Sequence, residues 1–186
     1  MIAGVMESDS HTTVTLLISE ARMTLLKLFL FLHIMSSIML VGGIFARQVV
    51  RGYAKTSPDI KVIAELYKAA GKIESVMIRP FTGFVVLFGA VYAAMIKAPI
   101  FGFLQGAAQN WLLVTNILVL MIPLPIIFFF IPRGKVFEPI MNDALAKGQV
   151  TPELREQLHD PGMKRMHLLE MLGVVFVVVV MVFKPF

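Results

Sequence analysis

Hydrophobic positions along the chain fall into four long stretches separated by more polar segments. Each stretch has about 20 mostly apolar residues, the length that an α-helix needs to cross the hydrocarbon core of a bilayer. The expected spans are residues 25–46, 76–96, 111–131 and 166–183. None has the form of a cleaved signal peptide. The pattern predicts an all-α protein, a membrane-embedded four-helix bundle.

Helix signals in the two long loops predict short helical extensions outside the membrane. Ser57 is an expected N-cap, with Pro58 at the first helical position. Thr151 followed by Pro152 indicates a second helix start. Proline also marks the spans themselves. Pro80 is expected to kink the second span without breaking it, and residues 123–125 (Pro-Leu-Pro) to interrupt the third.

Positive charge is distributed unevenly between the loops. Of the 17 Lys and Arg residues, thirteen lie in the two long loops and four lie on the other side of the spans. Basic residues accumulate in cytoplasmic loops. The long loops are therefore expected in the cytoplasm, with the short loop 97–110 and both termini on the outer side.

Residues 1–23 differ from the rest of the chain because they are polar and acidic. We expect them to be a separate N-terminal tail, with Met23 as an alternative start to Met1. Residues 24–186 then form the four-span transmembrane domain.

Composition narrows the class of protein. Hydrophobic residues make up 58% and charged residues 16% of the chain, against about a quarter charged in soluble domains. This composition excludes a typical soluble enzyme, a disordered chain and a nucleic-acid-binding domain. It indicates a chain whose main partner is the lipid bilayer. The absence of Cys excludes disulfides, thiolate catalysis and Cys-ligated metal centres. No phosphate loop, Ser/His/Asp set or HExxH motif is present, so no catalytic residue is assigned and no bare-metal site is predicted.

Ionisable side chains inside a span are costly and are therefore functional candidates. His33 lies about seven residues into the first span. Its imidazole is suited to ligate a haem iron or copper, or to relay a proton. The alternative is a packing histidine that hydrogen-bonds to a neighbouring hydroxyl or carbonyl.

A second candidate group lies near the opposite membrane face. His167 and Glu170 are three residues apart and share a helix face. Glu170 needs a partner, and Arg47 and Arg79 reach a similar depth. We expect these four residues to form an inner polar network. Its role is either to lock the inner helix ends or to relay protons or bind a metal.

Three segments carry a family resemblance. They are the first span, with Lys27, His33 and Gly42-Gly43; the loop KTSPDIKVIAELYKAAGKIESVMIRPFTG; and the C-terminal MVFKP. In order and spacing they resemble an uncharacterised family of bacterial four-span integral membrane proteins, domain of unknown function 2269. The first span is also similar to that of copper-resistance D proteins and of membrane protoporphyrinogen oxidase. The resemblance implies a multi-pass protein of the bacterial inner membrane, and the charge distribution then places both termini on its periplasmic side.

The similarity to the oxidase implies haem b or a porphyrin as cofactor, with His33 as the ligand. The leading interpretation is therefore a haem- or porphyrin-associated protein in redox chemistry or cofactor handling. One alternative is a non-catalytic accessory subunit of a larger membrane complex. Another is a small ion or metal transporter that works as a homodimer around Pro123 and Pro125.

Overall fold

The fold is all-α. The computed structural model describes the backbone of residues 3–185 and the side chains of residues 13–122 and 124–185, and no strand occurs in this part of the chain. The helices are α1 (Ala3–Thr56), α2 (Ile60–Ile73), α3 (Arg79–Met95), α4 (Trp111–Met121), α5 (Pro123–Pro125), α6 (Ile131–Lys147), α7 (Pro152–Leu158) and α8 (Pro161–Phe183). Three short segments, η1 (Glu74–Ile78), η2 (Gly102–Gln105) and η3 (Ile126–Phe130), connect them.

Four helical stretches are long and apolar enough to cross a membrane. Within the described residues they are Thr13–Thr56, Ile60–Met95, Trp111–Lys147 and Pro152–Phe183. Three of them contain a predicted span whole, and the second ends at Met95, one residue before the predicted end of its span. The four long apolar helices confirm the prediction of a multi-pass membrane protein.

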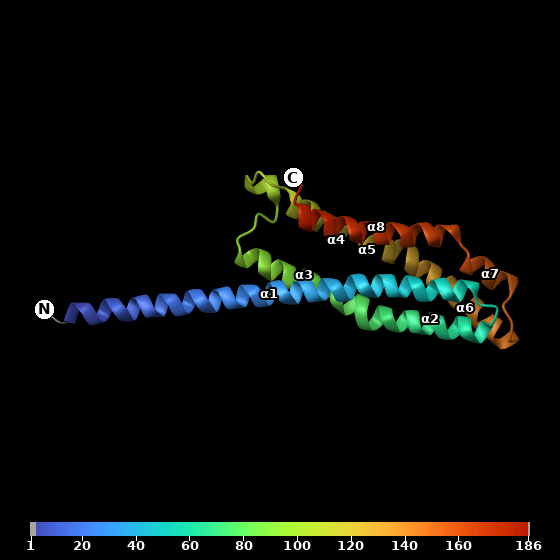
Figure 1. Cartoon of the computed structure of the whole chain (residues 1–186). Helices are drawn as coiled ribbons and strands as arrows, with labels where there is room; N and C mark the ends of the chain where they lie inside the picture. The colour runs from blue at the N-terminus through green and yellow to red at the C-terminus, as the bar shows by residue number, and fades with distance from the viewer. Residues whose placement is uncertain (1–2, 186) are drawn as a thin grey trace. The chain divides into compact units, whose positions relative to one another are not determined.

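Helix α1 is longer than the predicted first span at both ends (Figure 1). It runs unbroken for 54 residues, from Ala3 to Thr56. Residues 3–22, which the sequence set apart as a tail, therefore continue the helix of the first span. At the other end, the helix carries Arg47 and Arg51 beyond the apolar stretch.

The described chain divides into two compact units. The first, here called the α1–α3 unit, comprises residues up to 38 and residues 81–98. The second, called the larger unit, comprises residues 39–80 and the chain from residue 99 onwards. Each unit contains one of the two candidate sites.

The larger unit has a hydrophobic core formed by the segments that connect its spans. Fully or almost fully buried side chains from the end of α1, from α2, α6 and α7 pack together, and they are Ala54, Ile60, Ile63, Met141, Ala144, Leu154 and Leu158. The Tyr67 ring stacks on Phe137 at 4.7 Å between centroids. The predicted helical extensions of the long loops are thus present, and they pack on one another.

Capping residues explain where the short helices begin. Thr151 is the N-cap of α7, as predicted, and its hydroxyl accepts a hydrogen bond from the Leu154 amide. The prediction for α2 was wrong by two residues. Its N-cap is Asp59 rather than Ser57, because the Asp59 carboxylate accepts from the Lys61 amide at 2.8 Å.

Prolines shape the second and third spans by widening one helical turn. Five-residue π-helical turns, η1 and η3, are closed by bonds from the Arg79 amide to the Glu74 carbonyl and from Ile131 to Ile126. A proline, Pro80 or Pro132, follows each closing residue directly. A proline ring clashes with the carbonyl four residues earlier, and a wider turn relieves that clash. Pro80 does not break its helix, as predicted, and α4 ends at Met121 just before Pro123.

The segment of the larger unit that precedes α4 is held by side-chain hydrogen bonds to its own backbone. Asn110 accepts a hydrogen bond from the Phe103 amide, and Gln105 accepts one from Phe101. At the neighbouring helix ends, the Lys184 ammonium lies 4.9 Å from the centre of the Trp111 ring. This contact ties the end of α8 to the start of α4.

Candidate functional site

His33 is held between the two helices of the α1–α3 unit by one specific hydrogen bond. Its Nδ1 lies 2.9 Å from the carbonyl oxygen of Val85 on α3. Because a carbonyl only accepts, Nδ1 is the donor and carries the proton. A neutral imidazole then has its lone pair on Nε2. Among the residues that the structure describes, no hydrogen bond engages Nε2.

A glycine on α3 makes room for this ring. A Cβ added at Gly89 would lie 2.8 Å from Cε1 and 2.9 Å from Nδ1 of His33, but 3.7 Å from Nε2. The imidazole therefore packs against bare backbone at residue 89, with Nε2 the ring nitrogen farther from it. Ser37 also donates to the His33 carbonyl at 2.8 Å, one turn along α1.

Aromatic rings lie beside His33 on both helices. Phe29, one turn before His33 on α1, is 6.3 Å from Phe88, the neighbour of Gly89 on α3. Phe84 in turn stacks on Phe88 at 5.7 Å with an interplanar angle of 23°. The three rings thus form one aromatic cluster on the two helices that hold His33, and Phe84 is 43% exposed.

The inner polar network centres on a short ion pair between α1 and α8. Arg47 Nη2 lies 2.6 Å from both carboxylate oxygens of Glu170. The Arg47 side chain is only 7% exposed and that of Glu170 17%. Two charges removed from water to this extent are stabilised mainly by each other.

Glu74 connects the remaining arginines to this pair. Its carboxylate lies 3.4 Å from Arg47, 3.9 Å from Arg51 and 3.2 Å from Arg79. Arg79 does not reach Glu170 in any described contact, and its side chain is 74% exposed. Arg79 therefore belongs to the network only through Glu74, at its exposed edge.

Both ring nitrogens of His167 are already engaged. Arg51 Nη1 lies 3.1 Å from Nε2, and Glu170 Oε2 lies 3.4 Å from Nδ1. A guanidinium only donates, so Nε2 accepts and Nδ1 carries the proton that faces Glu170. The Phe130 ring stacks on the imidazole at 4.8 Å. His167 is thus a neutral connector with no lone pair left for a metal ion.

The two π-helical turns contribute directly to the network. Glu74 is the first residue of η1, and Phe130 is the last residue of η3. Such turns are rare and are frequent at functional sites. At the start of η1 Glu74 contacts Arg47 on α1, and at the end of η3 Phe130 contacts His167 on α8.

Sequence reasoning offered both Arg47 and Arg79 as partners of Glu170, and among the described contacts only Arg47 reaches it. It did not foresee that Glu74 contacts three arginines. Nor did it foresee that Arg51, four residues after Arg47, bonds to His167. The signal was the spacing of four residues between the two arginines, which puts both on one face of α1.

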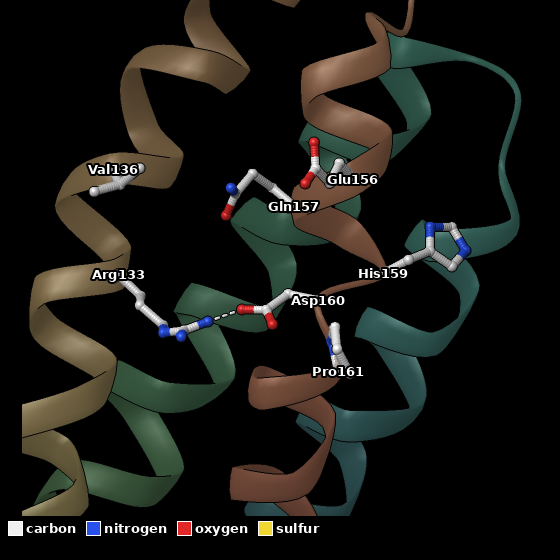
Figure 2. Close-up of a pocket in the computed structure, with 7 residues that line it drawn as sticks. All are labelled: Arg133, Val136, Glu156, Gln157, His159, Asp160 and Pro161. Carbon is white, nitrogen blue, oxygen red and sulfur yellow. Dashed lines mark ion pairs between the residues drawn. The ribbon is translucent and has the colours of Figure 1, made fainter.

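A separate charged hollow opens between α6 and the α7–α8 connection (Figure 2). It is lined by Arg133, Val136, Glu156, Gln157, His159, Asp160 and Pro161. Arg133 forms an ion pair with Asp160, which also caps α8 by accepting from the Gly162 amide. Since Arg133 and Asp160 neutralise each other and Asp160 caps α8, these two residues have a structural role and we assign no binding site to the hollow.

The chain matches no family model, no curated protein sequence and no solved structure. The function is therefore argued from the two sites themselves.

Proposed function

We propose that this chain is a haem- or porphyrin-associated protein of the bacterial inner membrane, and that His33 is the iron ligand. One observation carries the proposal: Nδ1 of His33 is fixed on the Val85 carbonyl while Nε2 has no partner among the described residues. Metal-ligating histidines typically donate their second ring nitrogen to a carbonyl or carboxylate, which fixes both tautomer and ring orientation.

The surroundings of His33 fit a porphyrin better than a bare metal ion. In the described part of the chain, no three His, Cys, Asp or Glu residues are grouped to hold a metal ion. A haem iron needs only one or two protein ligands, because the porphyrin supplies four nitrogens. The Phe29, Phe84 and Phe88 rings offer apolar aromatic surface for a macrocycle, although only Phe84 and Phe88 are near-parallel and Phe29 is tilted by 47° from Phe88.

When bound, haem would supply one-electron chemistry, and the chain would contribute the axial ligand and its orientation. This chemistry fits electron transfer, porphyrin oxidation or cofactor handling. We further propose that the protein belongs to the four-span family that it resembles, with the basic loops cytoplasmic and both termini periplasmic.

Visible spectroscopy tests the proposal directly. The detergent-purified protein, oxidised and dithionite-reduced, is expected to show a Soret band and reduced α and β bands. His33→Ala should abolish them. His159→Ala is the matched control, because His159 is exposed and bonds only within its own helix end.

A colourless protein that takes up no added haem would overturn the proposal, as would unchanged bands in His33→Ala. In either case His33 is a packing residue. The accessory-subunit interpretation then becomes the leading one, and it is tested by isolating the protein with its membrane partners under mild solubilisation.

A further inference from the structure

One face of α1 is exposed along the whole described helix and follows a seven-residue repeat. Counted in sevens from Val14 and from Leu17, thirteen positions up to Thr56 lie on this face, and every one of them is exposed. None carries a charge, and eight have a large apolar side chain. We call these thirteen positions the heptad face, because their alternating spacing of three and four residues is that of positions a and d in a coiled coil.

The opposite face of α1 makes the contacts within the chain. His33, Arg47 and Ala54 all occupy position f of the same repeat, which points directly away from positions a and d. His33 contacts α3, Arg47 contacts α8, and Ala54 is buried in the core of the larger unit. The heptad face is therefore the side of α1 that the described residues leave uncovered.

Lipid does not account for the whole of this face. The described part of α1, Thr13–Thr56, has 44 residues, so it is about 66 Å long at 1.5 Å per residue, whereas the hydrocarbon core of a bilayer is about 30 Å thick. Val14 and Leu17 lie before the predicted first span, and Val49 lies after it. Each of these three side chains is 54–60% exposed. The apolar repeat therefore continues beyond the membrane, where a protein partner rather than lipid would cover it.

A second copy of α1 has the properties of such a partner. A helix with an unbroken seven-residue repeat packs against another helix with the same repeat, and the two wind around each other. In the described part of the chain α1 is the longest helical stretch, with 44 residues against 32–37 in the other three. Two copies inserted in the same orientation run parallel, so each position of the heptad face meets its own counterpart.

The charges on α1 are compatible with this pairing. No charged residue lies at positions a or d, whereas Glu20, Lys27 and Lys55 lie at the flanking position g. In a parallel pair position g lies near position e of the partner helix and not near its own counterpart. Two identical heptad faces therefore meet without placing like charges opposite each other.

The exposed area is sufficient for a stable pair. The eight large apolar side chains are 39–60% exposed, and at roughly 100 Å² each they offer about 800 Å² per helix, the area that each partner of a standard interface buries. We propose that two copies of this chain form a parallel dimer through the heptad faces of their α1 helices. The dimer is independent of the haem proposal, since His33 lies on the opposite face of α1.

Disulfide cross-linking in membranes tests the interface, because the chain has no native cysteine. On oxidation, the single-cysteine variants Leu17→Cys and Val49→Cys should form covalent dimers, since like residues of the heptad face lie within disulfide reach of each other. Ser19→Cys is the matched control. Ser19 is exposed two residues from Leu17 but occupies position f, so this variant should stay monomeric. His33→Ala should leave the cross-linking of Leu17→Cys unchanged.

A charged substitution tests the same interface in detergent. Val49→Lys places two ammonium groups opposite each other and should lower the dimer association constant by about tenfold or more, because like charges facing each other across an interface oppose association. Light scattering over a concentration series measures the constant, and circular dichroism checks that the variant is folded. Val62→Lys on α2, where the valine is 46% exposed against 58% for Val49, is the control and should dimerise like the wild type.

Three results would overturn the proposal. A monomeric wild type would mean that lipid and water cover the heptad face. Cross-linking of Leu17→Cys to a protein of different mass would mean that another protein covers it. Equal cross-linking of Leu17→Cys and Ser19→Cys, or unchanged dimerisation of Val49→Lys, would mean that any dimer forms through a different surface.

Discussion

Arg47 and Glu170 are separated by 123 residues in sequence, yet their charged groups lie 2.6 Å apart. This contact joins the first and last membrane helices within the larger unit. Because both side chains are largely buried, the stability of this unit should depend on keeping the two charges together.

Glu170→Gln is expected to lower the free energy of unfolding by about 3–5 kcal/mol, the usual cost of leaving one partner of a buried pair uncompensated. Thermal unfolding followed by the single tryptophan, Trp111, measures the change. The double variant Arg47→Met/Glu170→Met removes both charges and should be more stable than Glu170→Gln. Equal stability of the two variants would show that the pair is not coupled.

Substitution by alanine is expected to change stability in opposite directions at Gly43 and Gly42. A Cβ at Gly43 would lie 2.9 Å from Met77 Cβ and 3.1 Å from Ile78 Cγ1, whereas Gly42 has nothing within 4 Å. Gly43→Ala should therefore destabilise the protein by about 1–3 kcal/mol through overpacking. Gly42→Ala should be neutral or stabilising by up to about 1 kcal/mol, since alanine favours helix. Comparison of the two Tm values decides the point.

Gly89 provides a test of the His33 site that leaves the histidine in place. Gly89→Ala places a methyl group against Nδ1 and Cε1 and should displace the ring from the Val85 carbonyl. Loss of such a supporting contact typically lowers metal-site affinity by about 10–100-fold. Haem titration followed at the Soret band measures the affinity. Gly83→Ala, on the same helix with open space around it, should bind haem like the wild type.

Much of this architecture could be predicted from the sequence, because membrane helices are encoded locally. A stretch of about twenty apolar residues in a bilayer must form a helix, whatever that helix packs against. Thr151 and Pro80 likewise affect only the helical turn in which each lies, as N-cap and as proline. That Glu170 pairs with an arginine was predictable from depth, since an isolated carboxylate within a span needs a cation, but depth did not distinguish Arg47 from Arg79.

Other features depend on how helices are paired, which local patterns do not specify. The His33–Val85 bond requires α1 to lie beside α3 with Gly89 facing the ring. The bridging role of Glu74 depends on η1 lying beside α1, because two of the three arginines that Glu74 contacts belong to α1. The start of α2 was misplaced because Ser57 and Asp59 are both good caps, and only the backbone conformation at Asp59 favours the second.

The absence of native cysteine allows the proposed topology to be tested without a background variant. Gln109→Cys lies in the short loop before α4, and Gln149→Cys lies in the turn after α6. A membrane-impermeant maleimide should label residue 109 in spheroplasts, whose outer membrane has been removed and whose inner membrane is intact. It should label residue 149 only after permeabilisation. The reverse pattern would place both termini in the cytoplasm.

The π turn η3 gives the third span one residue of tolerance. Phe130, its last residue, stacks on His167, Phe137 beyond it stacks on Tyr67, and Trp111 before it meets Lys184. A π turn holds one residue more than an α-helical turn, so deletion of Ile127 should restore ordinary α-helical spacing and leave the flanking helices in register. A one-residue deletion between Phe130 and Phe137 should instead turn the two rings relative to each other by about 100°, so that their two stacking contacts could not form together. The second deletion should therefore lower the Tm more than the first, although neither removes a charged group of the polar network.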